Sequence, residues 1–127
     1  MREILFRGKT DKGEWVYGDL FKVFDDGSFI HDGKCHSVKV IPETIGQYTG
    51  LTDKNGTKIF EGDIVHISER GKSVNGKIIF ENAYCGGWLV ADETEKSKCS
   101  LAMRNDVEVI GNIHDNPELL KEREGND

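Results

Sequence analysis

The sequence predicts a mainly β fold, with a small SH3-like barrel in the C-terminal half and an N-terminal β region that packs against it or exchanges a strand with it. The 127 residues include 15 glycines and 2 prolines, which favours many turns between short strands over long helices. From residue 58 onward, short β-branched and aromatic runs alternate with loops that carry glycine. A chain of this length forms one domain or two small subdomains. We therefore expect one domain over 1–127, with β subregions 1–47 and 48–115 and a short C-terminal helix.

Four apolar runs predict strands in the first subregion: Ile4–Phe6, Glu14–Phe24, Ser28–His31 and Val38–Ile41. Gly18 interrupts the second run, where a bulge or a close approach of another backbone is expected. The Asp26-Gly27 step predicts a hairpin between the second and third runs. Pro42 is expected to end the fourth, because proline has no backbone N–H to donate.

The stretch Tyr48–Ile67 contains two turns, and the rest of the chain is organised around it. Polar side chains that bond nearby backbone, together with glycines that accept positive φ, mark both turns. A β-branched strand over 64–67 follows the second turn. The structural turn residues are Asp53, Asn55, Gly56, Glu61, Gly62 and Asp63.

The same acidic residues allow two other interpretations. A calcium loop of the EF-hand type needs glycine at its sixth position, whereas Gly56 is the fourth residue counted from Asp53. A plain turn is therefore favoured. Glu61 and Asp63 could act as an acid/base pair, but carboxylates beside Gly62 more often accept hydrogen bonds from nearby backbone.

Three further strands and one helix are expected near the C-terminus. Asn75-Gly76 predicts a turn that leads into the first of these strands. A helix over 117–122 follows from Asn116 as its cap and Pro117 at its first position. The expected strands are Lys77–Phe80, Trp88–Val90 and Val107–Ile113.

Arg70, Lys72 and Lys77 form the one local basic segment, and with an exposed Trp88 or Tyr84 they could bind single-stranded nucleic acid by charge and stacking. The whole chain opposes this, because its net charge is -6 and its pI about 5.2, and a negative field repels phosphate. A solvated hairpin loop is the favoured interpretation.

Trp15 and Tyr17, with Phe21 and Phe24, could form a ligand face or a contact between subunits. Aromatic residues in strands usually belong to the core. A small chain without disulfides can also bury some of them between copies. We therefore expect a homo-oligomer with Trp15 and Tyr17 at the contact.

The cysteines and histidines do not predict a metal site. Structural zinc sites usually contain closely spaced cysteine pairs, and the sequence has none. Nothing resembles a phosphate loop or a nucleophile elbow, so we expect no cofactor, no metal and no catalytic residues. The residues considered are His31, Cys35, His36, His66, Cys85, Cys99 and His114.

No secretory leader follows Met1 and no apolar run approaches the length of a membrane span. Free cysteines without a pairing pattern are typical of reducing compartments. These features predict a cytoplasmic protein.

The whole chain resembles the YopX family. The segments that carry the resemblance are Arg2–Ile4, Phe6–Lys9, Gly13–Gly18, Pro42–Leu51, Asp53–Gly56, Ile59–Val65, Val109–Ile113 and Asn116–Leu119. The resemblance implies a mainly β protein of phages and prophages in Gram-positive bacteria, and it supplies no catalytic residues. We therefore expect a non-enzymatic accessory protein in the bacterial host cell that acts through protein–protein contacts. The alternative is a nucleic-acid-binding accessory factor.

Overall fold

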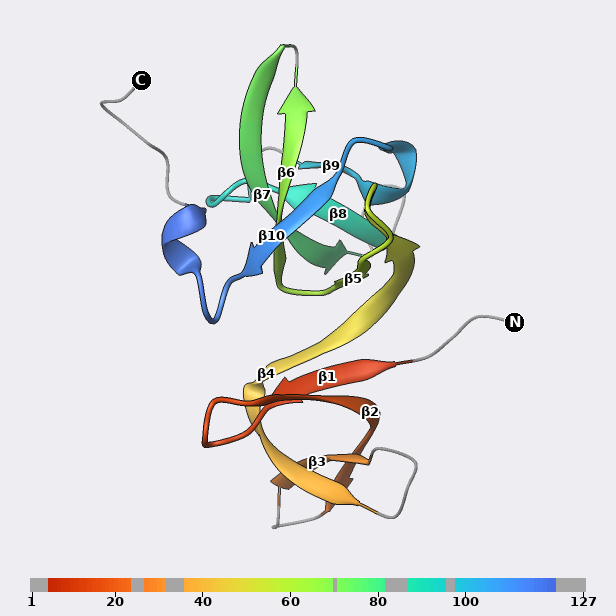
Figure 1. Cartoon of the computed structure of the whole chain (residues 1–127), viewed down its shortest axis with the longest axis vertical. Helices are drawn as coiled ribbons and strands as arrows, with labels where there is room; N and C mark the ends of the chain where they lie inside the picture. Colours follow the sequence, from red (N-terminus) through yellow and green to blue (C-terminus); the bar gives the residue numbers. More distant parts are fainter. Residues whose placement is uncertain are drawn as a thin grey trace. The chain divides into compact units, whose positions relative to one another are not determined.

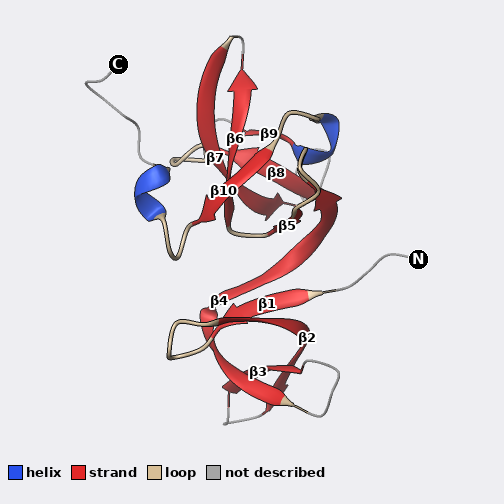
Figure 2. Ribbon diagram, in the orientation of Figure 1, coloured by secondary structure: helices blue, strands red, loops and turns tan. Residues whose placement is uncertain are grey.

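The computed structural model describes residues 5–23, 27–31, 36–69, 71–81, 87–95 and 98–120. The chain divides into two compact units, Met1–Gly50 and Leu51–Asp127. Strands dominate both units, and the helices of the described residues are short 3₁₀ turns (Figures 1 and 2). The predicted mainly β fold with a small barrel is confirmed.

The first unit is built from four antiparallel strands, of which the last continues two residues into the second unit. Each strand pairs with the next, and β1 also pairs with β4, which closes a small four-stranded barrel. The sequence predicts a barrel only in the C-terminal half, whereas the structure also has one in the first unit. The strands are β1 (Phe6–Lys9), β2 (Trp15–Val23), β3 (Gly27–His31) and β4 (Ser37–Thr52).

Close packing between β1 and β4 depends on a glycine. A Cβ on Gly8 would lie 2.9 Å from Val40 Cβ, which is too close for two carbon atoms. Val40 and Ile30 are 3% and 1% exposed and belong to the buried interior of this unit. Glycine therefore lets β1 lie directly over the side chain of Val40.

β4 contains a bulge where the sequence predicted its end. The β1–β4 register shifts between Ile41 and Gly46, and Pro42 lies exposed within the shift. Its missing N–H costs no ladder hydrogen bond at a bulge, so β4 continues past it. Thr44 Oγ1 fastens the bulge, because it accepts the N–H of Lys9 at 2.8 Å and donates to the carbonyl of Ile41 at 2.6 Å.

The second unit has the strand order β10-β6-β7-β8-β9. Within this sheet, the last strand along the chain, β10, pairs with the first, β6. This is the strand order of an SH3-like barrel. A short strand, β5, precedes β6 in the chain and pairs with β4. The elements are β5 (Lys58–Phe60), β6 (Asp63–Glu69), β7 (Lys72–Glu81), β8 (Gly87–Ala91), β9 (Lys98–Ser100), η1 (Leu101–Met103), β10 (Glu108–Asn112) and η2 (Pro117–Leu119).

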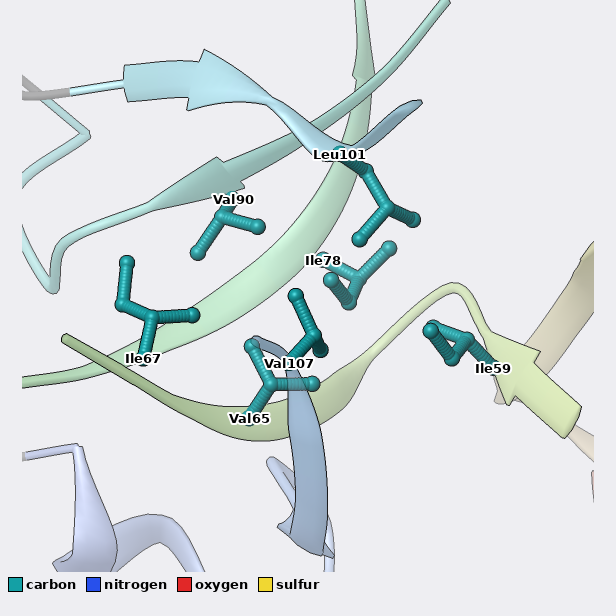
Figure 3. Packing of buried hydrophobic residues seen from close by; sticks show 7 residues of the cluster. All are labelled: Ile59, Val65, Ile67, Ile78, Val90, Leu101 and Val107. Carbon is teal, nitrogen blue, oxygen red and sulfur yellow. The ribbon is translucent and has the colours of Figure 1, made fainter. Parts of the chain in front are cut away.

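Seven side chains from several parts of the second unit meet in its core, and Figure 3 shows them pointing toward one another. Each is at most 4% exposed. Burying one such aliphatic side chain stabilises the fold by roughly 1.5–3 kcal/mol. The second unit therefore has a hydrophobic core of its own. The seven are Ile59, Val65, Ile67, Ile78, Val90, Leu101 and Val107.

Two local predictions in this unit are wrong. Asn75 and Gly76 lie inside β7 and not in a turn, because both pair with β6. The helix expected over 117–122 is only the 3₁₀ turn η2, and Lys121 onward lies outside the described residues. Asn116 makes no cap hydrogen bond; its Oδ1 instead accepts the N–H of Asn112 at 3.3 Å.

Candidate functional site

Asp53 is a structural residue that joins the first predicted turn to β10. Its Oδ1 accepts the N–H groups of Asn55 and Thr57, both at 2.9 Å, and its Oδ2 accepts the N–H of Val109 at 2.9 Å. Burial favours the neutral acid, but the hydrogen bonds from Val109, Thr57 and Asn55 outweigh it and lower the pKa of Asp53. Gly56 completes the turn with a φ of +87°.

The second predicted turn separates its two carboxylates. Asp63 is 2% exposed and its Oδ2 accepts the N–H of Phe60 at 2.7 Å, whereas Glu61 is exposed. Gly62 donates to the carbonyl of Ile78 and accepts from the N–H of Ile113. Because one carboxylate is buried against backbone and the other faces solvent, their arrangement is that of a turn and not of an acid/base pair.

Among the described residues, only part of the basic segment expected to contact nucleic acid is exposed to a ligand. Arg70 lies outside the described residues and Lys72 is exposed at the start of β7. Lys77 Nζ forms an ion pair with Glu95 at 2.7 Å, and its side chain is 19% exposed. Trp88 is half-buried and packs edge-on against Phe80, with ring centroids 5.0 Å apart.

Trp15 and Tyr17 lie on β2 and differ in their surroundings. Trp15 is half-buried, with the Arg7 guanidinium 4.7 Å and the Lys9 ammonium 5.7 Å from its ring centroid. Tyr17 is 47% exposed. Of this pair, Tyr17 presents more surface to a partner.

The described residues contain no group of three or more His, Cys, Asp or Glu side chains placed to hold a metal ion. Cys35, Cys85 and Tyr84 lie outside the described residues. Cys99 is half-buried, and its sulfur accepts a hydrogen bond from Arg104 Nη1 at 3.7 Å.

The clearest candidate site is an open groove of about 770 Å³ in the second unit. One wall is formed by residues 73–76 of β7. Together with Lys72 they make up the segment Lys72–Gly76, which we call the β7 edge. On one side it pairs with β6, but pairing with β8 begins only at Lys77, opposite Ala91. In the part of the chain that the structure describes, no strand pairs with the other side of the β7 edge, and such edges can accept an added strand.

The groove combines an apolar lining with an acidic rim. Its apolar residues include core side chains and two exposed ones, Val74 and Ile110 (40% and 37% exposed). Its acidic residues are Asp92, Glu93 and Glu118. Lys98, the lysine that lines it, forms an ion pair with Glu81 at 2.7 Å.

A polar contact holds the η2 turn against the β7 edge. Asn75 Nδ2 donates to the carbonyl of Leu119 at 2.9 Å, and Asn75 Oδ1 lies 3.1 Å from His66 Nδ1. Sequence patterns missed this contact because Asn75-Gly76 was expected to turn. In the sequence, the strand expected before residues 82–86 is longer than the strand expected after them. This difference in length could have predicted that part of the longer strand has no partner on one side.

A family model for the YopX protein matches residues 5–121. The chain belongs to the YopX family. The crystal structure of protein EF1440 from Enterococcus faecalis is similar to this YopX-family chain, with 25% sequence identity and a TM-score of 0.59. The similarity covers 95% of this chain and 100% of that one. No curated protein matches the chain.

No helix among the described residues of this YopX-family protein is both long and apolar enough to cross a membrane.

Proposed function

We propose that this YopX-family chain is a non-enzymatic accessory protein of a phage or prophage, located in the cytoplasm of the bacterial host, that binds an extended segment of a partner protein. The observation that supports it is the unpaired β7 edge beside an open groove. The family membership supports the phage setting. We also propose that the chain assembles as a homo-oligomer through the part of β2 that carries Trp15 and Tyr17.

The β7 edge provides the backbone groups that an added strand needs. In an antiparallel ladder, alternate residues direct their N–H and C=O groups away from the existing partner strand. Lys72–Gly76 pair with β6 on one side, so the alternate groups of this segment point toward the groove side. An extended peptide that pairs with them gains main-chain hydrogen bonds, while the groove selects its side chains.

The groove also defines the chemistry of the partner segment. Val74, which is 40% exposed, offers apolar contact to the side chains of an added strand that lie on its face, and these are every second residue of that strand. Asp92 and Glu93 place two carboxylates beside the same segment. The segment that fits therefore alternates apolar residues with lysine or arginine.

Selection from a library of random linear peptides tests this binding mode. We expect enriched peptides to contain alternating apolar and basic residues, and Val74→Glu to weaken their binding about tenfold or more by placing a charge in the apolar lining. Met103→Glu is the matched control, because Met103 is 83% exposed and does not line the groove.

A second variant separates charge from apolar contact. Asp92→Asn combined with Glu93→Gln should weaken binding of basic peptides and reduce its salt dependence. Enriched peptides that bind wild type and Val74→Glu equally well, or a library that yields no binders, would show that the groove does not accept extended segments.

A further inference from the structure

The outer surface of the first unit carries a row of three side chains across β2, β3 and β4. Phe21 pairs with Phe29, and Phe29 pairs with Lys39. Directly paired residues lie on the same face of a sheet, and successive residues alternate between faces. Because the neighbouring residues Ile30 and Val40 are buried inside, the row of Phe21, Phe29 and Lys39 points outward. We call it the aromatic row.

The two rings of the aromatic row stack on each other, and solvent reaches the Phe21 ring. Their centroids are 5.5 Å apart and their planes differ by 14°, so the rings are stacked. Phe21 is 39% exposed. A stacked pair left open to water is an apolar platform of the kind on which a planar group can stack.

A lysine is placed beside this platform. Lys39 is exposed, and its Cε lies 2.9 Å from the position of a Cβ on Gly27. The lysine stem therefore crosses over Gly27, where any larger residue would displace it. This packing keeps the ammonium group on the same face as the rings.

The charge of the chain is distributed unevenly between its two units. Residues 1–50 contain 7 Lys and Arg against 8 Asp and Glu, whereas residues 51–127 contain 10 against 15. By the same alternation of faces, the charged residues directed outward from β1–β4 beside the aromatic row include Lys9 and Lys39, against Asp19. Arg7 adds little to this surface, because it is 6% exposed and packs against the Trp15 ring. This face is therefore basic within an acidic protein.

We propose that the aromatic row binds single-stranded nucleic acid. An unpaired base stacks on the Phe21–Phe29 pair, and the Lys39 ammonium contacts a neighbouring phosphate. Aromatic rings combined with cations along a groove or face are the usual means of sequence-tolerant single-strand binding. A double-stranded duplex does not fit this mode, because its bases are already stacked.

Two other assignments fit the observations less well. The segment with Arg70, Lys72 and Lys77 lies in the acidic unit, and Lys77 is held by Glu95. A contact between two copies centred on the aromatic row would bring the Lys39 ammonium groups of the two copies together, which costs electrostatic energy. A polyanion neutralises the same face instead.

Fluorescence anisotropy of labelled oligothymidylate, titrated with the full chain at several salt concentrations, tests the proposal. We expect Phe21→Ala to weaken binding about tenfold with little change in salt dependence. Lys39→Gln should lower the slope of log affinity against log salt by about 0.7, the value for one phosphate contact on a single strand. Phe21→Tyr keeps the ring and should bind like wild type.

Two controls complete the experiment. Ile41→Ala removes an exposed aliphatic side chain (38% exposed) from the same face and Lys72→Ala removes a cation from the other unit; both should bind like wild type. The proposal is overturned if wild type does not bind the oligonucleotide at low salt, or if Phe21→Ala and Lys39→Gln bind as wild type does. It is also overturned if Phe21→Tyr binds as weakly as Phe21→Ala, since the ring would then be irrelevant.

Discussion

Asp106 connects the segment before β10 to β6 through charged hydrogen bonds. Its carboxylate accepts Arg104 Nε and Nη2, each at 3.0 Å, and the N–H of Ser68 at 2.9 Å. The bond from Arg104, followed by that from Ser68, lowers the pKa of Asp106 from 3.8 to about 2. The pKa of Asp53 is also lowered, there mainly by backbone N–H donors, with a smaller contribution from the charge of Lys54.

We expect the stability of the protein to fall in acid, and Asp106 to cause part of the fall. Because its pKa is lower in the folded state, its stabilising contribution is complete above the ordinary value of 3.8 and is lost as the pH falls through about 2. Asp106→Asn should therefore flatten the free energy of unfolding against pH in this interval, measured by urea unfolding. Asp11→Asn, at an exposed turn, should keep the wild-type slope, and an unchanged slope in Asp106→Asn would contradict the assignment.

At the scale of the element, Gly76 allows β7 to lie close to the end of β8. A Cβ on Gly76 would lie 2.6 Å from Val90 Cγ1 and 2.9 Å from the carbonyl oxygen of Ala91. A backbone atom cannot swing away as a side chain can. The close approach requires glycine, although this residue does not need a positive φ.

Gly76→Ala should therefore destabilise the protein by about 1–3 kcal/mol, the usual cost of overpacking. Ser73→Ala is the control on the same strand, because Ser73 is exposed, and it should change stability by less than about 0.5 kcal/mol. Denaturant unfolding of both variants measures the difference. Equal stability of Gly76→Ala and wild type would mean that β8 can shift without cost.

The elements that sequence predicted well are those with a local cause. The hairpin predicted at the Asp26-Gly27 step is confirmed by the pairing of β2 with β3, although Asp26 itself lies outside the described residues. The turn at Asp53 follows from a side chain that bonds its own neighbours. Asn75-Gly76 carries an equally strong local signal, yet tertiary pairing overrides it. Pro42 fails as a strand end for a similar reason, because a bulge accommodates it.

The candidate sites could not be predicted in this way, because they depend on which strands pair and on how many residues of each strand have a partner. The β7 edge exists because β7 has 10 residues and β8 only 5. The aromatic row exists because the register places Phe29 opposite both Phe21 and Lys39. Strand register is set by the packing of the whole sheet, and a local sequence pattern does not reveal it.

At the scale of the whole molecule, the two units differ in charge and in the surface that each presents. The second unit combines its acidic excess with an apolar groove, which suits a basic peptide. The first unit presents exposed aromatic residues on a basic face. Val74→Glu should therefore not affect the affinity for an oligonucleotide.

Assembly is the remaining property at this scale, and Tyr17 is the residue that tests it. Trp15 is half-buried beside Arg7 and Lys9, so replacing it would disturb the barrel as well as any contact. Tyr17, 47% exposed on the same face of β2, can be changed with less risk to folding. An exposed aromatic side chain is a common anchor of a subunit contact.

We expect sedimentation equilibrium to give a mass that is a multiple of 14.3 kDa, and Tyr17→Glu to lower it by placing a charge in the contact. Met103→Glu changes a more exposed apolar residue outside this unit and should leave the mass unchanged. A wild-type protein that sediments at 14.3 kDa, or a Tyr17→Glu variant with the wild-type mass, would remove this contact. Because Phe21 lies four residues along β2 from Tyr17, the mass of Phe21→Ala then decides whether the contact extends into the aromatic row.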